Sequence, residues 1–143
     1  MVLLIEKDDV AIYTLSKDSL PIFFEMHVVR DNDELEKYVK DFYRGVYKRE
    51  DVWEEGTRAL VRATGYKGDA PFAYLFVSED ALGTRVLSHE CLHLALAYSR
   101  AAGRKLPTAE AGIDDAEEDL CYLIGDMMAG VVSTLRENGH YNE

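Results

Sequence analysis

The chain has 143 residues, and its 27 acidic and 16 basic side chains leave a formal net charge of −11 at pH 7. A chain of this length most simply forms one domain, here over residues 1–143, and a hydrophobic content of 48% excludes wholesale disorder. The excess negative charge disfavours nucleic acid and anionic membrane surfaces, so peptides, cations or basic proteins are the expected partners.

The N-terminal residues and the cysteines predict a cytoplasmic protein. The apolar run over residues 2–5 has no basic lead and is far shorter than a signal-peptide core or a membrane span. Cys91 and Cys121 are the only cysteines, and both lie in helical patterns. We therefore expect reduced thiols and no disulfide framework.

The first part of the chain predicts three strands and a helix. Runs typical of strands cover residues 2–5, 10–15 and 22–30. Apolar residues then recur at helical spacing over residues 32–47, which predicts an amphipathic helix covering one face of the sheet.

The second part predicts one strand and two long helices. A short helix is expected over residues 53–63, and a strand over residues 72–78, where Pro71 favours an edge position. Long helices are predicted over residues 84–102 and 114–137. The fold class is therefore α+β, a sheet of about four strands with a covering helix and a helix pair.

The first long helix contains His89-Glu90-Cys91-Leu92-His93, which has the pattern H-E-x-x-H. Residues four apart share one helix face, so both imidazoles can bind one Zn²⁺ while Glu90 points a carboxylate at water on the metal. Between residues 86 and 95 only Glu90 is charged, so a buried flank offers these polar groups no other partner. The alternative is that both histidines are hydrogen-bonded in the core or at its rim, with Glu90 in a surface ion pair.

The motif and its uncharged flanks resemble those of the zincin metallopeptidases. The metzincin branch is excluded, because Leu96 and Ser99 occupy the positions of its glycine and its third histidine. The gluzincin branch takes its third ligand from a glutamate of the next helix, where this chain has Glu117 and Glu118. The resemblance covers residues 84–137, implies a minimal zincin fold, and extends to small phage and bacterial H-E-x-x-H proteins of unknown substrate.

Glu118 is the third zinc ligand that the resemblance favours, and Glu117 is the alternative. Asp114 and Glu117 have the spacing of a capping box, which gives Glu117 another role. Glu118 stands seven residues before Gly125, as the ligand glutamate commonly does in gluzincin-like sequences. We expect its face of the helix, rich in small residues, to pack closely against the histidine-bearing helix. Tyr122 replaces an aspartate that supports a ligand histidine in many gluzincins.

Several other side chains stay open as candidates. Cys121 is a possible thiolate ligand, although a small buried cysteine is the favoured interpretation, and Cys91 is expected in the core. His27 is interpreted as a strand residue, and His140 lies beyond the end of the second helix, too far along its axis to reach the metal unless the tail folds back. The residue that stabilises the oxyanion is not chosen among Tyr66, Tyr74, Tyr98 and Tyr122.

These observations predict a zinc-dependent hydrolase, a metallopeptidase in which His89, His93 and Glu118 bind Zn²⁺. Glu90 is the general base toward metal-activated water. In zincins the substrate peptide pairs with an edge strand before the active helix, here residues 72–78, unless that strand is only the apolar edge of the sheet. The alternative function is an acidic, non-catalytic interaction or regulatory protein of the phage type with a metal-stabilised helix pair. The expected partner is a peptide or protein, and the oligomeric state is left open.

Overall fold

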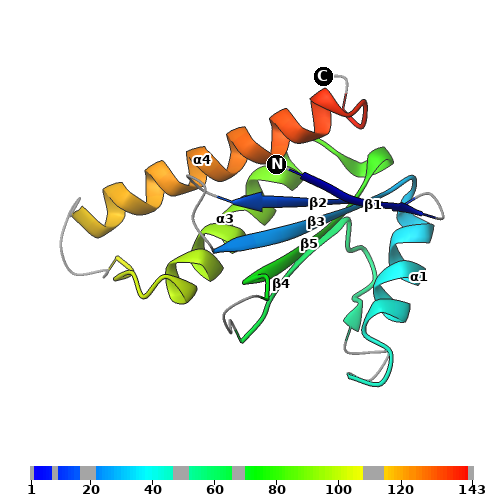
Figure 1. Cartoon of the computed structure of the whole chain (residues 1–143), viewed down its shortest axis with the longest axis horizontal. Helices are drawn as coiled ribbons and strands as arrows, with labels where there is room; N and C mark the ends of the chain where they lie inside the picture. The colour runs from blue at the N-terminus through cyan, green and yellow to red at the C-terminus, as the bar shows by residue number, and fades with distance from the viewer. Residues whose placement is uncertain are drawn as a thin grey trace.

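The computed structural model describes residues 2–7, 10–16, 22–46, 52–65, 70–107 and 115–141. Within them five strands form one sheet in the order β1-β2-β3-β5-β4. The strands are β1 (Val2–Lys7), β2 (Val10–Ser16), β3 (Phe23–Val29), β4 (Ala59–Ala63) and β5 (Ala73–Ser78). The helices are α1 (Asn32–Phe42), the short 3₁₀ helix η1 (Glu79–Ala81), α3 (Thr84–Ala101) and α4 (Asp115–Glu137). Figure 1 shows α3 and α4 on one face of the sheet and α1 on the other, so the α+β class is confirmed.

The sheet is antiparallel except at its centre. β1 pairs with β2, β2 with β3, and β4 with β5 in antiparallel register, whereas β3 and β5 are parallel. A parallel pair needs a crossover connection, and α1 with the segment after it makes that crossing. The central strands are therefore covered on both faces.

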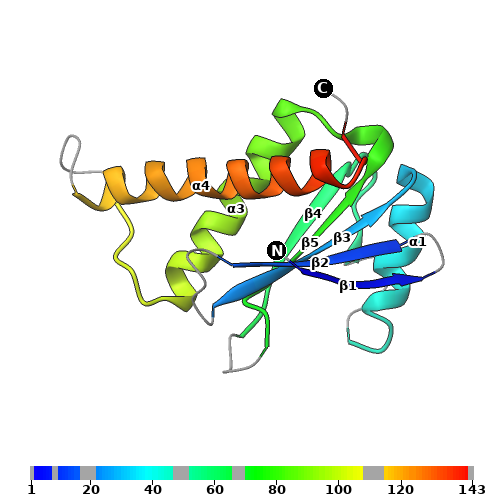
Figure 2. The same ribbon diagram turned by 45° about the horizontal axis from the view of Figure 1, so that its top comes forward.

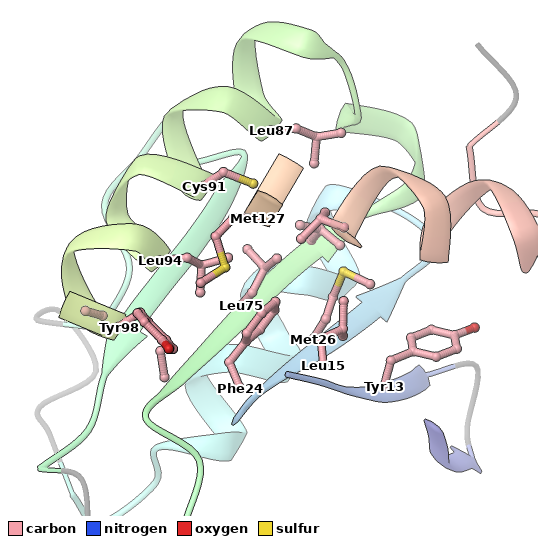
Figure 3. Packing of buried hydrophobic residues seen from close by; sticks show 14 of the residues in the cluster. Tyr13, Leu15, Phe24, Met26, Leu75, Leu87, Cys91, Leu94, Tyr98 and Met127 are labelled. Atoms are coloured by element: carbon pink, nitrogen blue, oxygen red, sulfur yellow. The ribbon is translucent and has the colours of Figure 1, made fainter. Parts of the chain in front are cut away.

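Each face of the sheet has its own core. Alternate residues of β5 divide between them: Leu75 and Val77 join the larger cluster with α3 and α4, whereas Phe76 joins the smaller cluster with α1. Figure 3 shows Leu87, Cys91 and other side chains of α3 directed toward the sheet in the larger cluster. This alternation follows from the two-residue period of a strand, in which successive side chains point to opposite faces of the sheet.

α1 covers the sheet as predicted but is shorter than predicted. It begins after Asp31, whose side chain accepts a hydrogen bond from the backbone N–H of Glu34 at 2.9 Å, and it buries Leu35 and Val39. It ends at Phe42 because residues 43–46 form turns in which Gly45 has a φ of 81°. That left-handed conformation favours glycine and stops the helix.

Two predictions about the sheet are wrong. Residues 59–63 form strand β4 and no helix, which adds a fifth strand to the predicted sheet of about four. Strand β5 lies between β3 and β4 and is therefore not an edge strand. Phe72, just before β5, donates its backbone N–H to the carbonyl of Phe23 at 2.8 Å. Strand β4, next to α3, is the edge strand at this end of the sheet.

The two long helices are confirmed, but one predicted packing face is wrong. α3 and α4 agree with the predicted ranges to within about one residue, and Asp114 lies outside the described residues. α4 packs through a stripe of buried apolar residues: Leu123, Met127, Val131 and Leu135. The face through Glu118, Tyr122 and Gly125 is exposed, and Tyr122 is 70% exposed. In the described part of the chain, no helix is long and apolar enough to cross a membrane.

Candidate metal centre

α3 brings His89, Glu90 and His93 together in one group. One potential ligand atom from each lies within 4.8 Å of the other two, and the two imidazole centroids are 5.0 Å apart with planes at 71°. Two nitrogen donors on one tetrahedral zinc ion lie about 3.4 Å apart, given metal–nitrogen distances of about 2.0–2.1 Å. The group is thus somewhat wider than a bound ion would make it, and its residues could hold a metal ion.

The local sequence of α3 explains why the histidines are available. Leu87, Cys91 and Leu94 form the stripe that packs on the sheet (Figure 3). His89 and His93, four residues apart, occupy a different face and are both exposed. The helix is therefore anchored by its apolar side while the two imidazoles stay free to bind.

Glu90 is an acidic residue in a buried position, which is unusual for a charged side chain. It is only 5% exposed although it sits between two exposed histidines. Burial raises the pKa of its carboxyl group, and the charges of His89 and His93 oppose that rise. Among the described residues nothing donates a hydrogen bond to its carboxylate, whose oxygens keep some contact with solvent. Two imidazoles and a carboxylate are donors that bind divalent metal ions, so the residues present fit a metal ion.

The group opens onto a groove of about 560 Å³ between α3 and β4. Ala59, Leu60 and Val61 of the edge strand line it, and so do Arg58 and Arg85. Sequence reasoning missed both arginines, because they stand 27 residues apart (85 − 58) and neither belongs to a motif. Only the pairing of β4 with β5 brings Arg58 close to the start of α3.

Glu118 lies outside this group. α3 and α4 run in roughly opposite directions (Figure 2), and Ser99 at the end of α3 lines one pocket together with Asp119 and Leu123 of α4. The first turns of α4 therefore lie beside the last turns of α3. From His89 to Ser99 is ten residues (99 − 89), or about 15 Å along the helix axis. Glu118 is exposed, and its role as third ligand stays a prediction.

The tyrosines considered for the oxyanion are dispersed. Tyr98 is 1% exposed in the larger core, Tyr74 packs in the smaller core on the other face of the sheet, and Tyr122 is exposed on α4. Tyr66 lies outside the described residues. Of the three described tyrosines, none lines the groove.

The two cysteines differ in environment. Both are free thiols, as predicted. Cys91 is fully buried in the core, as expected, and burial together with the charge of Glu90 raises its pKa to about 12. Cys121 is exposed, so the interpretation of it as a buried residue is wrong. Cys121 does not belong to the stripe of buried residues through which α4 packs on the core.

The remaining histidines have structural partners. His27 is 2% exposed; its Nε2 lies 3.1 Å from a carboxylate oxygen of Glu25 and its Nδ1 lies 2.6 Å from the hydroxyl of Tyr38. His140 bridges the hydroxyl of Tyr13 at 2.6 Å and a carboxylate oxygen of Glu79 at 3.3 Å. Each imidazole is thus held between a tyrosine and a carboxylate and does not belong to the His89-Glu90-His93 group.

Comparison with known proteins identifies no relative. No protein-family profile, no curated protein and no solved structure matches the chain. The zincin likeness therefore rests on the motif itself. What the structure gives is a His89-Glu90-His93 group on α3 that could hold a metal ion.

Proposed function

We propose that the protein is a zinc-dependent hydrolase that cleaves peptide bonds in the groove beside α3. The observation that carries the proposal is the group of His89, Glu90 and His93, in which one potential ligand atom from each residue lies within 4.8 Å of the other two at the groove. A carboxylate beside two imidazoles that can hold a metal ion is in position to take a proton from water.

His89 and His93 would hold the ion through imidazole nitrogens, which suit zinc. When bound, the ion supplies Lewis-acid chemistry, polarising a substrate carbonyl and increasing the acidity of water. Glu118 is the third ligand that the zincin resemblance implies. It lies on α4 beside the last turns of α3, so it would have to move toward the histidines to bind the ion. The proposal therefore depends on the histidine pair and treats Glu118 as a separate question.

Glu90 would transfer the proton. Its carboxylate oxygen accepts a proton from the attacking water as the water oxygen bonds to the carbonyl carbon. The carbon–nitrogen bond then breaks, and Glu90 returns the proton to the leaving amine. Burial raises the pKa of the Glu90 carboxyl group, which makes its carboxylate a stronger proton acceptor.

The edge strand supports a peptide as substrate. β4 is last in the sheet order, so its second edge is not paired with any described strand. The strand also forms one side of the groove that contains His89, Glu90 and His93. An extended peptide added along β4 would gain main-chain hydrogen bonds and pass beside the histidine pair.

Zinc titration combined with peptide digestion tests this function. Protein treated with chelator should bind about one Zn²⁺ per chain, and zinc at about 100 times its dissociation constant should stabilise the fold by about 2.7 kcal/mol. His89→Ala and His93→Ala should abolish that stabilisation. Glu90→Gln, the matched control, should still bind zinc but no longer cleave an unbiased peptide library. Absence of zinc binding by the parent chain, or undiminished cleavage by Glu90→Gln, would refute the proposal.

A second candidate is an acidic, non-catalytic interaction protein with a metal-stabilised helix pair. The net charge of −11 and the position of Glu118 outside the histidine group support it, since a site with few protein ligands can serve binding alone. Under this candidate Glu90→Gln would change nothing measurable, and the parent chain would bind zinc without cleaving any library peptide. The same two assays therefore separate the candidates.

A further inference from the structure

The groove beside α3 carries positive charge in a strongly acidic protein. Its ionisable lining consists of Arg58, Arg85 and the His89-Glu90-His93 group, in a chain whose net charge is −11. Both arginines are exposed, and neither forms an ion pair with a carboxylate of the described residues. Because no carboxylate of the described residues pairs with them, these two guanidinium groups can donate hydrogen bonds to an incoming anion.

The two arginines lie at the same end of the groove. Arg58 immediately precedes β4, whose first residue, Ala59, pairs with Val77 near the end of β5. From there the chain passes through η1 into α3, and the first turn of α3 carries Arg85. Both arginines thus stand at the end of the groove where α3 begins.

The spacing along α3 relates this charge to the proposed reaction centre. Arg85 and His89 are four residues apart, so they share a face of the helix and lie about 6 Å apart along its axis. An extended peptide advances about 3.3 Å per residue. A carboxylate bound at Arg85 would therefore belong to a residue about two positions from the peptide bond beside His89.

We infer that Arg58 and Arg85 bind an acidic side chain of the substrate, about two residues to one side of the cleaved bond. This inference rests on the proposed function and adds a substrate class to it: extended peptides with Asp or Glu at that position. A guanidinium group binds a carboxylate with two parallel hydrogen bonds, and two such groups at one end of a groove fix the register of the peptide. The surrounding negative charge disfavours long polyanions, so a single local carboxylate is the ligand that fits.

Paired peptides measure the preference directly. Fluorogenic peptides that carry Glu or Gln at each position on either side of one bond are compared by kcat/KM on the zinc-loaded protein. We expect the Glu peptide to be cleaved at least tenfold faster at a position about two residues from the bond. The double variant Arg58→Ala/Arg85→Ala should reduce the Glu-to-Gln ratio to about one, mainly through a higher KM for the Glu peptide. Arg100→Ala, which removes an exposed arginine of α3 outside the groove, should keep the ratio.

A binding measurement separates failure of this inference from failure of the proposed function. Fluorescence anisotropy of labelled Glu and Gln peptides on zinc-loaded Glu90→Gln protein reports recognition without cleavage. Tighter binding of the Glu peptide that disappears in the arginine double variant and weakens with added salt supports the inference, even if no peptide is ever cleaved. Equal binding of the two peptides, or a preference unchanged by the double variant, would overturn it.

Discussion

Lowering the pH should destabilise the fold through His27. This imidazole is 2% exposed and lies between Glu25 on its own strand, Tyr38 of α1 and Tyr74 of β5. Burial lowers its pKa, and the hydrogen bond and charge of Glu25 only partly oppose that effect. An unfolded histidine titrates at about 6.5, so below that pH the unfolded chain binds a proton that the folded chain does not. The stability that the neutral His27 contributes to the fold is therefore fully present above pH 6.5. It is lost as the pH falls from 6.5 toward the lowered pKa of the folded state.

The size of this effect follows from linkage. If one histidine stays neutral in the folded state, the free energy of unfolding falls by up to about 1.4 kcal/mol as the pH is lowered from 7.5 to 5.5. Urea denaturation followed by the fluorescence of Trp53, the single tryptophan and a member of the core cluster on the α1 side, measures it at each pH. His27→Gln keeps an acceptor for Tyr38 and a donor for Glu25 but does not titrate, so its stability should depend on pH less steeply. Parallel pH curves for the parent chain and His27→Gln would refute this reasoning.

Two further predictions follow from α3 and α4. Cys121 is exposed, whereas Cys91 is buried and its pKa is raised to about 12. A thiol reagent such as Ellman's reagent should therefore modify one thiol per folded chain and the second only after unfolding. If both thiols reacted at equal rates, the burial of Cys91 would be contradicted. The assignment of Glu118 as third ligand predicts that Glu118→Ala weakens zinc binding at least tenfold in calorimetric titration while Glu117→Ala changes it less than about twofold. Equal dissociation constants for the two variants would instead match the arrangement described, in which Glu118 lies outside the histidine group.

Local chemistry made most of the fold predictable. The strands β1, β2, β3 and β5 and the helices α3 and α4 were located from composition and periodicity, because each combines a strong pattern with a clear boundary. β4 was missed because its sequence, Ala-Leu-Val-Arg-Ala, contains residues that favour helices. Its strand conformation comes from antiparallel pairing with β5, which a local pattern does not reveal. The wrong edge strand followed from that single omission.

The candidate site divides in the same way. His89, Glu90 and His93 were predictable because four-residue spacing places the histidines on one face of any helix. The packing face of α4 was misassigned to small residues near Glu118, although Leu123, Met127, Val131 and Leu135 form a stronger stripe at four-residue spacing. That stripe was the available signal. The contribution of Arg58 to the groove depends on sheet order, so no sequence pattern would have indicated it.

The residues that line the groove have a further consequence for how the site forms. All of them lie between Gly56 and His93, in the residues just before β4, in β4 itself and in α3. A chain made from its N-terminus onward therefore completes the histidine pair and both walls of the groove before any of α4 has been synthesised. Their sheet partner β3 is made earlier still. The proposed reaction centre is thus encoded by one continuous segment, and a metal ion could first meet its two imidazole ligands on the nascent chain.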